Sequence, residues 1–368
     1  MEEKSVWKGN HAMAEAAIRA GFRFFGGYPI TPASPFLEYM SDRMPEAGGV
    51  FIQGSAEVEV PCMLMGAAFG GKLALTATSG PGFALMGEGL SAMGGGRIPA
   101  LIVFVNRTGA EAGSLPGTQD CYEVSTGSLG NGGMHAFVYG PGSMQEAVDM
   151  IYEAPMIMLK YSTPVIVLVD AMIAQMVEGG IVMPTYRPLP ENMHTYRFVI
   201  DRARQKEELR EVSATPRWGP FPREGFDAQA NIEYNYQGNE AMYLQWKSDE
   251  VQYETYRMED AEYLIAAWGS PARFAHDAVD RLRDRGVKAG LFRPKTLFPF
   301  PEHQLGALSP SQVKGILCVE MAVPAQFYYD VKAAVDQRIP VKSYHRILGL
   351  PRADVIAEEM MQFIGEVE

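Results

Sequence analysis

The chain has 368 residues, of which 47% are hydrophobic and 21% charged, with a formal net charge of −12 at pH 7. This composition predicts a globular protein of two or three domains and excludes wholesale disorder. The negative charge argues against nucleic-acid binding. The sequence contains neither an apolar run of transmembrane length nor a signal-peptide pattern at its N-terminus, so we expect a cytoplasmic protein without a membrane segment.

The first half of the chain, from Asn10 to Asp170, alternates strand-like and helix-like segments separated by glycine-marked turns, which predicts an α/β sheet. Asn10, Ser55 and Ser143 are expected to cap helices. The continuously apolar run at 100–105 is typical of a central parallel strand. The predicted strands are 22–25, 73–77, 100–105 and 164–169, and the predicted helices are 10–20, 55–69, 83–93 and 143–158.

The second half begins with a segment of different character. Residues 183–258 contain many prolines, aromatic residues and charge runs without a clear period, and we interpret them as an extended linker or interface segment lying on a partner subunit. A second, smaller α/β unit follows. The predicted division is therefore 1–182, 183–258 and 259–368, with strands at 263–268, 287–292 and 315–320 and helices at 272–285 and 327–335 in the last unit.

The three cysteines and six histidines are dispersed and predict no disulfide framework, zinc site or iron–sulfur site in this chain. Cys62 and Cys318 lie in apolar runs and are expected to be buried. Cys121 follows Asp120 in a polar loop and is a candidate for a position near a ligand. We therefore predict no metal ligands here.

Two segments, one just past a predicted strand and one at a predicted helix start, carry candidate ligand groups, because an open parallel sheet presents its ligand site at such positions. Thr31 lies between Pro29 and Pro32, where it can satisfy its own backbone or contact a ligand. Glu57 lies at a predicted helix start, where the helix dipole alone favours a carboxylate by about 0.3–1 kcal/mol. Glu59 is the alternative, and the spacing does not exclude it.

Two further segments follow the next predicted strands. The segment 78–82 can be a tight strand-to-helix turn, and its glycine spacing does not fit a phosphate-binding fingerprint. Arg107 comes directly after a buried strand, next to Asn106. An arginine there can be an ordinary loop residue or can bind a carboxylate, for which its planar, two-pronged guanidinium is suited and a lysine is not.

Taken together, these segments resemble the α subunit of the 2-oxoacid:ferredoxin oxidoreductases of the 2-oxoisovalerate or 2-oxoglutarate type. The likeness extends over about residues 8–176 and 260–350. It implies a thiamine-diphosphate-binding, pyrimidine-type parallel-sheet domain followed by a smaller α/β domain like the C-terminal domain of transketolase. The motifs that carry it are Tyr28-Pro29-Ile30-Thr31-Pro32, Gly54-Ser55-Ala56-Glu57-Val58, the loop 76–82, Arg107, the segment 293–301 and Val319-Glu320-Met321.

The resemblance also implies roles for individual residues. Glu57 would hydrogen-bond the pyrimidine ring of thiamine diphosphate and activate the cofactor. Thr31 and Arg107, helped by Asn106, would bind the substrate, so that Glu57, Arg107 and Thr31 are the catalytic candidates. The cofactor-binding candidates are Glu57, Tyr28, Pro29, Ile30, Thr78, Ser79 and Gly80.

The same likeness implies partners, because the chain lacks the Gly-Asp-Gly frame that holds magnesium and the diphosphate in thiamine enzymes. In the family a β subunit supplies that Mg²⁺ site and a [4Fe-4S] cluster. A γ subunit and a ferredoxin-like δ subunit often complete the complex, coenzyme A is the co-substrate, and ferredoxin accepts the electrons.

The substrate is less defined by these residues. The stretch 108–113 after Arg107 contains no positive charge to bind a second carboxylate, which favours a branched-chain or aryl 2-oxoacid over 2-oxoglutarate. A non-oxidative thiamine-dependent decarboxylase or transketolase-like subunit, and a non-catalytic scaffold, are the alternatives. The chain departs from its relatives at Asn131-Gly132-Gly133, where they commonly have His-Gly-Asp, and at Pro61, where they usually have a small residue.

Overall fold

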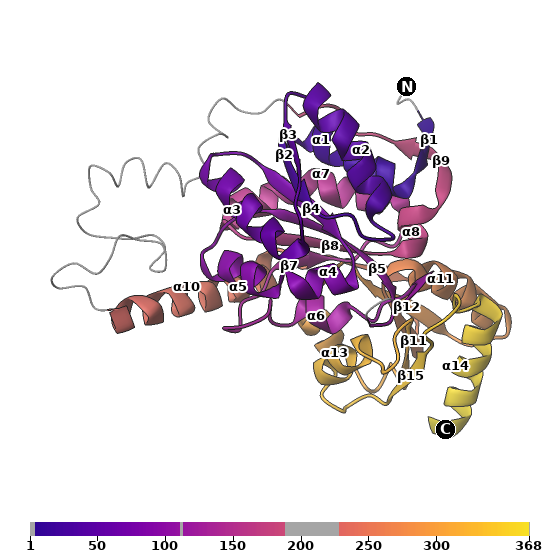
Figure 1. The fold of residues 1–368 in the computed structure, drawn as a ribbon. Coiled ribbons are helices and arrows are strands. Elements are labelled where there is room, and N and C mark those ends of the chain that lie inside the picture. The colour runs from indigo at the N-terminus through magenta and orange to yellow at the C-terminus, as the bar shows by residue number, and fades with distance from the viewer. Residues whose placement is uncertain (1–3, 111–112, 188–227, 368) are drawn as a thin grey trace.

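The computed structural model describes residues 4–110, 113–187 and 228–367, and it shows two α/β units built on parallel sheets (Figure 1). The larger sheet has eight strands in the order β13-β7-β8-β5-β4-β2-β3, with β6 paired to β5. The strands are β2 (Phe24–Gly27), β3 (Val50–Gln53), β4 (Ala74–Thr78), β5 (Leu101–Thr108), β6 (Ser114–Gly117), β7 (Phe137–Tyr139), β8 (Val165–Asp170) and β13 (Thr296–Phe298).

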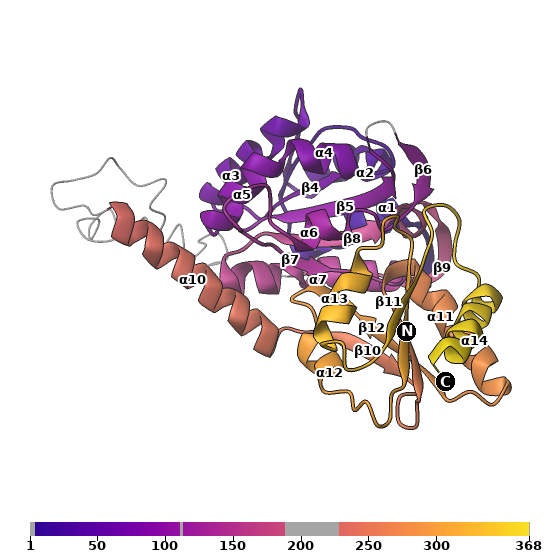
Figure 2. The same cartoon turned by 90° about the horizontal axis from the view of Figure 1, so that it is seen from below.

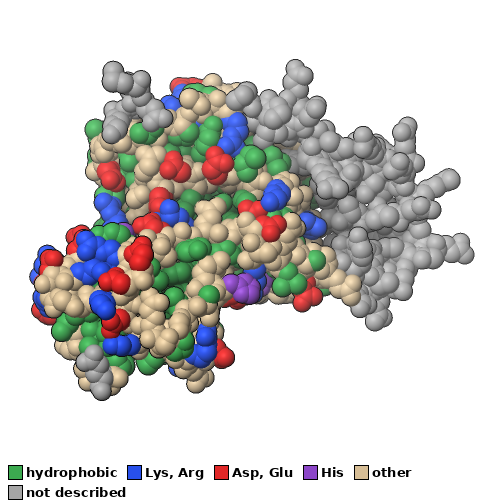
Figure 3. All heavy atoms as spheres, turned by 180° about the vertical axis from the view of Figure 1, so that it is seen from behind, with side chains coloured by type: hydrophobic (Ala, Val, Ile, Leu, Met, Phe, Trp, Pro, Cys, Tyr) green, Lys and Arg blue, Asp and Glu red, His purple; other side chains and the backbone are tan. Residues whose placement is uncertain are grey.

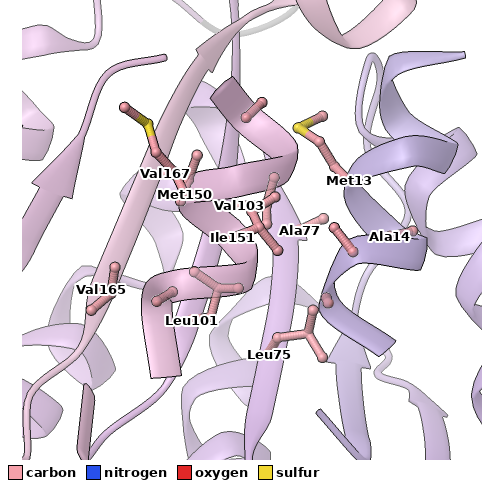
Figure 4. Packing of buried hydrophobic residues seen from close by; sticks show 14 of the residues in the cluster. Met13, Ala14, Leu75, Ala77, Leu101, Val103, Met150, Ile151, Val165 and Val167 are labelled. Atoms are coloured by element: carbon pink, nitrogen blue, oxygen red, sulfur yellow. The ribbon is translucent and has the colours of Figure 1, made fainter. Parts of the chain in front are cut away.

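Helices cover both faces of this sheet, as expected where parallel strands are buried on both sides (Figure 1). One core contains residues of α1, α2, α7 and α8, and the other contains residues of α3 to α6. In Figure 4, Met13 and Ala14 of α1 and Ile151 of α7 face Leu75, Leu101 and Val103 of the sheet. The helices are α1 (Gly9–Ala20), α2 (Ser34–Glu46), α3 (Val60–Phe69), α4 (Gly80–Leu85), α5 (Gly87–Gly95), α6 (Tyr122–Thr126), α7 (Met144–Tyr161) and α8 (Ala171–Gln175).

The second unit is a five-stranded sheet in the order β10-β12-β11-β14-β15, parallel except for β10 at one edge. Its outer face packs against α11 and α14, and its inner face packs with α13 toward the first unit. The elements are β10 (Tyr253–Tyr256), β11 (Tyr263–Ala267), α11 (Gly269–Asp284), β12 (Ala289–Pro294), α12 (Glu302–Gly306), β14 (Gly315–Glu320), α13 (Phe327–Ala334), β15 (Val341–His345) and α14 (Ala353–Val367).

The two units share one hydrophobic core. Leu90 and Phe104 of the first unit belong to the same buried cluster as Trp268 and Ile316 of the second. In addition, β13 pairs antiparallel with β7 and so adds a strand from the C-terminal part of the chain to the N-terminal sheet. The predicted fold class, a parallel α/β sheet domain followed by a smaller α/β unit, is therefore confirmed. The sequence did not indicate that β13 joins the sheet of the N-terminal unit.

The interpretation of 183–258 as extended is wrong for its second half, because α10 (Ala228–Asp249) is a helix. Trp246 is fully buried, and its ring contacts Phe137, Tyr161 and Phe298 edge-on, so this end of α10 belongs to the core of its own chain. The other end of α10 projects from the body of the molecule (Figure 2). Residues 188–227 of this segment lie outside the described residues, and the three-part division of the chain stays a prediction.

Several local expectations were also wrong. Lys8 rather than Asn10 precedes the first turn of α1, and the 3₁₀ turn Glu57–Glu59 separates Ser55 from α3. The predicted helix 83–93 is two helices, α4 and α5. Cys62 is exposed rather than buried, because α3 is apolar on its outer side as well as on its inner side.

Two other local expectations are confirmed. The hydroxyl of Ser143 caps its helix by accepting from Glu146 N, and Cys318 is buried.

The distribution of charge on the surface and the length and polarity of the helices can be compared with what the composition predicts. Acidic and basic side chains are interspersed over the face in Figure 3, without a large basic patch there. Among the described residues, no helix combines the length and the apolar character needed to cross a bilayer.

A buried arginine of the second unit forms an ion pair with a glutamate of the first unit. Arg293 of β12, only 5% exposed, donates to both carboxylate oxygens of Glu146 on α7, at 2.7 and 2.5 Å, and to Glu254 of β10 at 2.7 Å. Burial disfavours ionisation of Glu146, but the hydrogen bonds and charge of Arg293 outweigh it and lower the pKa of this carboxyl to about 2. The Glu146 carboxylate is therefore ionised wherever the protein is folded near neutral pH.

Replacing Glu146 with Gln is expected to lower the free energy of unfolding at pH 7 by about 2–3 kcal/mol, because Arg293 stays buried and loses a charged partner. Since the folded-state pKa lies below the ordinary 4.5, the contribution is present above about pH 5 and is lost as the pH falls toward 2. Urea unfolding at pH 7 and pH 3 measures this, and the difference from wild type should shrink at pH 3. Glu46→Gln, which removes an exposed pair with Arg43, is the control and should cost less than about 1 kcal/mol.

Candidate functional site

The predicted site residues lie at one edge of the larger sheet. Strands β3, β2, β4, β5 and β8 are parallel neighbours, so the loops after their carboxyl ends meet. The backbone links them directly, since Gly54 N donates to Gly27 O at 2.9 Å and so joins the loop that leads to Glu57 to the loop that begins at Tyr28. The strand ends and the segments after them carry Tyr28–Thr31, Glu57, Thr78–Gly82, Asn106 with Arg107, and Asp170. Arg107 was expected directly after its strand but lies within β5, because the strand continues to Thr108 and pairs there with β6.

The loop Tyr28–Pro32 is held from both sides. The carbonyl oxygen of Pro32 accepts hydrogen bonds from Asn10 Nδ2 at 3.1 Å and from Gln175 Nε2 at 2.9 Å. Arg107 Nη1 donates to Thr31 O at 2.8 Å. The structure therefore brings Thr31 and Arg107 together although they are far apart in the sequence. Pro29 and Thr31 are exposed, and the side chains of Tyr28 and Ile30 are half-buried.

Glu57 is buried, with 7% of its surface exposed, and lies in the 3₁₀ turn before α3. A Cβ atom on Gly82 would come within 2.9 Å of Glu57 Oε1 and 2.4 Å of Thr78 Oγ1, so the start of α4 approaches both side chains closely only because residue 82 is glycine. Glu59 is exposed, and its carboxylate accepts from the backbone and hydroxyl of Ser55. The sequence left Glu57 and Glu59 as alternatives, and the difference in burial favours Glu57 as the residue of the candidate site.

Two fully buried polar groups at this edge offer unused hydrogen-bonding atoms. Ser79 Oγ and Asn106 Oδ1 have no hydrogen-bond partner among the described residues, although both side chains are 0% exposed. Buried polar atoms are normally paired, so such atoms are expected beside a ligand. Ser79 Oγ and Asn106 Oδ1 are therefore available to hydrogen-bond a polar ring such as that of thiamine, which the resemblance implies beside this loop.

Arg107 is positioned by a short hairpin. It pairs with Gly117 of β6, and Asn106 Nδ2 donates to Thr118 O at 3.0 Å. Asp120 accepts from Gly109 N and from the hydroxyl of Thr118, both at 2.8 Å. The hairpin that carries the guanidinium is thus closed by the segment immediately after it.

Sequence reasoning missed the residues that support these loops. Asn10 was expected as a helix cap, and Gln175 and Asp120 carried no motif. Cys121, expected near a ligand, lies 3.5 Å from where a side chain on Gly80 would begin. Burial, reinforced by the neighbouring Asp120 carboxylate, raises the pKa of the Cys121 thiol, so it is protonated at neutral pH.

At the same edge, Asp170 connects the two units. Its Oδ1 accepts from the backbone N–H groups of Met172 and Ile173, and its Oδ2 accepts from Ser270 N of the second unit. Burial raises the pKa of this carboxyl, and the hydrogen bond from Ser270 opposes that rise. Asp170 therefore serves as a cap and an interdomain contact.

The main cavity and the possible metal ligands were also compared with the predicted site. A cavity of about 900 Å³ is lined by parts of α6, α12 and α13, but it contains none of the predicted site residues. Within the described ranges, no group of three or more histidine, cysteine, aspartate or glutamate side chains is arranged to hold a metal ion.

Comparison with known proteins shows which protein family the chain resembles. Residues 15–259 match the thiamine-diphosphate-binding domain of the pyruvate flavodoxin/ferredoxin oxidoreductases, and residues 261–360 match core domain II of pyruvate:ferredoxin oxidoreductase. The ketoisovalerate oxidoreductase subunit VorB of Methanothermobacter marburgensis is 36% identical over 89% of this chain and 88% of its own length. The 2-oxoglutarate synthase subunit KorA of Methanocaldococcus jannaschii is 29% identical over 88% of this chain and 90% of its own.

Comparison with solved structures gives the same family. A 2-oxoglutarate:ferredoxin oxidoreductase from Magnetococcus marinus, solved with 2-oxoglutarate, coenzyme A and succinyl-CoA bound, superposes with a TM-score of 0.82 at 25% identity. The match covers 99% of this chain and 66% of that one, so this chain spans just under two thirds of that longer protein. An inactive split-gene transketolase shares the fold, with a TM-score of 0.58 at 13% identity. The chain belongs to the 2-oxoacid:ferredoxin oxidoreductase family, as an α subunit.

Proposed function

We propose that this chain is the α subunit of a coenzyme A-acylating enzyme that oxidatively decarboxylates a 2-oxoacid to an acyl-CoA, CO₂ and reduced ferredoxin. The observation that carries the proposal is the contact between Arg107 and Thr31, at the sheet edge where the buried Glu57 also lies. A guanidinium, a hydroxyl and a buried carboxylate at one edge are the groups needed to bind a 2-oxoacid beside a thiamine ring.

Thiamine diphosphate, when bound, supplies the nucleophilic carbon and the electron sink that decarboxylation of a 2-oxoacid requires. In this proposal Glu57 would hydrogen-bond a nitrogen of the pyrimidine ring and hold a proton at that atom. Ser79 Oγ and Asn106 Oδ1 are available to hydrogen-bond polar atoms of the bound molecules. The other residues that would hold the cofactor are Tyr28, Pro29, Ile30, Thr78, Ser79 and Gly80.

Arg107 binds the substrate carboxylate and Thr31 contacts the carboxylate or keto oxygen, so that the keto carbon is oriented toward the cofactor. The hydrogen bond from Arg107 Nη1 to Thr31 O holds one guanidinium nitrogen against the Tyr28–Pro32 loop. The two residues that define the orientation of the substrate therefore also define each other's position.

For the substrate we propose a branched-chain or aryl 2-oxoacid. The hairpin beyond Arg107 contains Glu111 and neither lysine nor arginine, so it supplies no cation for a second carboxylate. The 36% identity to a ketoisovalerate oxidoreductase subunit supports this assignment. The alternative is 2-oxoglutarate, which is favoured by relatives named 2-oxoglutarate synthase subunits and by the structural neighbour that holds 2-oxoglutarate.

The proposed complex contains a β subunit with the Mg²⁺ and diphosphate site and a [4Fe-4S] cluster, a γ subunit and a ferredoxin-like δ subunit. Relatives are named as subunits, which supports a multi-subunit enzyme. The sequence of this chain provides no cysteine spacing for a cluster, so the electrons must leave through partner chains.

Viologen reduction by the anaerobically purified complex, with and without coenzyme A, tests the proposal. A panel of 2-oxoisovalerate, an aryl 2-oxoacid, pyruvate and 2-oxoglutarate should give coenzyme A-dependent reduction, with the highest kcat/KM for one of the first two. A higher kcat/KM for 2-oxoglutarate would contradict the substrate assignment. Release of CO₂ without reduction would indicate a non-oxidative thiamine enzyme, and thiamine binding without any turnover would indicate a scaffold.

A further inference from the structure

The segment Thr118–Cys121 lies between the hairpin that carries Arg107 and the second α/β unit. Toward the hairpin, Thr118 O accepts from Asn106 Nδ2 at 3.0 Å, and Asp120 Oδ2 accepts from Gly109 N at 2.8 Å. These bonds involve Asn106, directly before Arg107, and Gly109, which follows the last residue of β5. A shift of this segment would therefore move the end of β5 and the guanidinium with it.

Toward the second unit, Gln119 makes three buried hydrogen bonds. Its backbone N donates to Met321 O at 2.7 Å, its Oε1 accepts from Met321 N at 2.9 Å, and its Nε2 donates to Trp268 O at 2.8 Å. Trp268 and Met321 are the residues that directly follow β11 and β14. Gln119, with 0% of its surface exposed, thus ties the carboxyl ends of two central strands of the second sheet to the site of the first.

The backbone of the second unit leaves room for this amide. Gly269 has a φ of +60°, and a Cβ atom there would lie 2.9 Å from Gln119 Nε2. A side chain at this position would be strained and would press on the amide. The start of α11 is therefore compatible with the Gln119 amide only because residue 269 is glycine.

We propose that Gln119 is a positioning residue through which the second α/β unit holds Arg107 in place to bind the substrate carboxylate. The proposal rests on the proposed function, and it assigns a task to a unit that contains none of the predicted site residues. A two-pronged carboxylate contact depends on the position and plane of the guanidinium, so a small displacement weakens substrate binding. The buried Trp268 O and Met321 N cannot replace the amide with water without opening the interface.

The segment has other links that should preserve the fold when Gln119 is changed. Gln326 Nε2 donates to Asp120 O at 2.8 Å, and the Tyr122 hydroxyl donates to Asp330 Oδ2 at 2.5 Å. Substitution of Gln119 is therefore expected to loosen the segment locally rather than to separate the units.

The test compares Gln119→Leu and the nearly isosteric Gln119→Glu with Glu146→Gln in the intact complex. Glu146→Gln weakens the same interface between the units at the Arg293 contact, which involves no residue of the hairpin or of Thr118–Cys121, and serves as the matched control. Both Gln119 variants should raise KM for the 2-oxoacid, by about 10-fold or more for Leu, with KM for coenzyme A and thiamine content unchanged. Glu146→Gln should leave KM for the 2-oxoacid unchanged. An equal rise in all three variants, or no rise in the Gln119 variants, would overturn the proposal.

A second readout does not depend on turnover. In the purified full-length chain carrying Cys62→Ser, which removes the exposed thiol, Cys121 should react with a maleimide about 10-fold faster after Gln119→Leu and at the wild-type rate after Glu146→Gln. Faster labelling with unchanged KM would overturn the positioning role while leaving the proposed function intact. A wild-type complex that reduces no viologen with any 2-oxoacid would contradict the proposed function, and unchanged labelling would by itself overturn the link between Gln119 and the segment.

Discussion

Replacing Glu57 with Gln is expected to lower turnover of the assembled complex by about 10²–10⁴-fold, the range associated with loss of a positioned proton-transfer group. The amide has nearly the shape of the carboxylate and fits the same space beside Gly82, so the complex should still assemble. It cannot, however, take up and return a proton. Turnover of the 2-oxoacid with viologen as acceptor, together with the thiamine content of the purified complex, measures this effect.

Glu59→Gln is the matched control, because it makes the same chemical change two residues away. Glu59 is exposed, and its bonds to Ser55 lower its pKa without placing it against Gly82 or Thr78. Near-wild-type turnover is expected for this variant. Equal loss in both variants would indicate damage to the turn, and normal turnover in Glu57→Gln would remove Glu57 from the mechanism. Glu57→Ala should lose turnover at least as completely.

Replacing Arg107 with Lys is expected to lower kcat/KM for the 2-oxoacid by about 10–100-fold, because charge-assisted hydrogen bonds contribute about 1.5–3 kcal/mol and the ammonium cannot make the two-pronged contact. Arg107→Met, which also removes the charge, should lose more. The hydrogen bond to Thr31 O is also lost, so the effect should appear mainly in KM. Steady-state kinetics of viologen reduction across 2-oxoacid concentrations provides the measurement.

Arg43→Lys serves as the control for this arginine, since Arg43 forms a surface pair with Glu46 on α2. It should leave kcat/KM within about twofold of wild type. If Arg107→Lys behaved like Arg43→Lys, Arg107 would not bind the substrate carboxylate, and the proposed orientation of the substrate would fail with it.

The substrate assignment depends on a different feature of the same hairpin. A dicarboxylic 2-oxoacid needs a second cation to offset the burial of its distal carboxylate. The stretch 108–113 supplies only Glu111, whose placement lies outside the described residues. A partner subunit can supply such a cation, which is why the substrate panel has to be run on the intact complex.

Local sequence alone was enough to identify the α/β class and to indicate the segments of the candidate site. Continuous apolar runs such as 100–105 and 164–169 indicated central parallel strands, and polar, glycine and proline residues directly after strands indicated the ligand edge. These features are local, because the preferences of a strand, a turn or a cap depend on neighbouring residues. For the same reason, the expected cap by Ser143 is confirmed.

Only the tertiary structure decided how these local elements meet. The contact of Arg107 with Thr31, the burial of Glu57 rather than Glu59, and the link from Gln119 to Met321 each join residues or surroundings that no local pattern relates. An apolar run does not specify which of its faces meets the core, which is why Cys62 is exposed on α3. Likewise, burial of Trp246 and pairing of β13 with β7 depend on surfaces contributed by distant parts of the chain. Such choices follow from the free energy of packing the whole molecule, so the sequence by itself determined the α/β class, most of its strands and the candidate site segments, and the packed structure determined their arrangement.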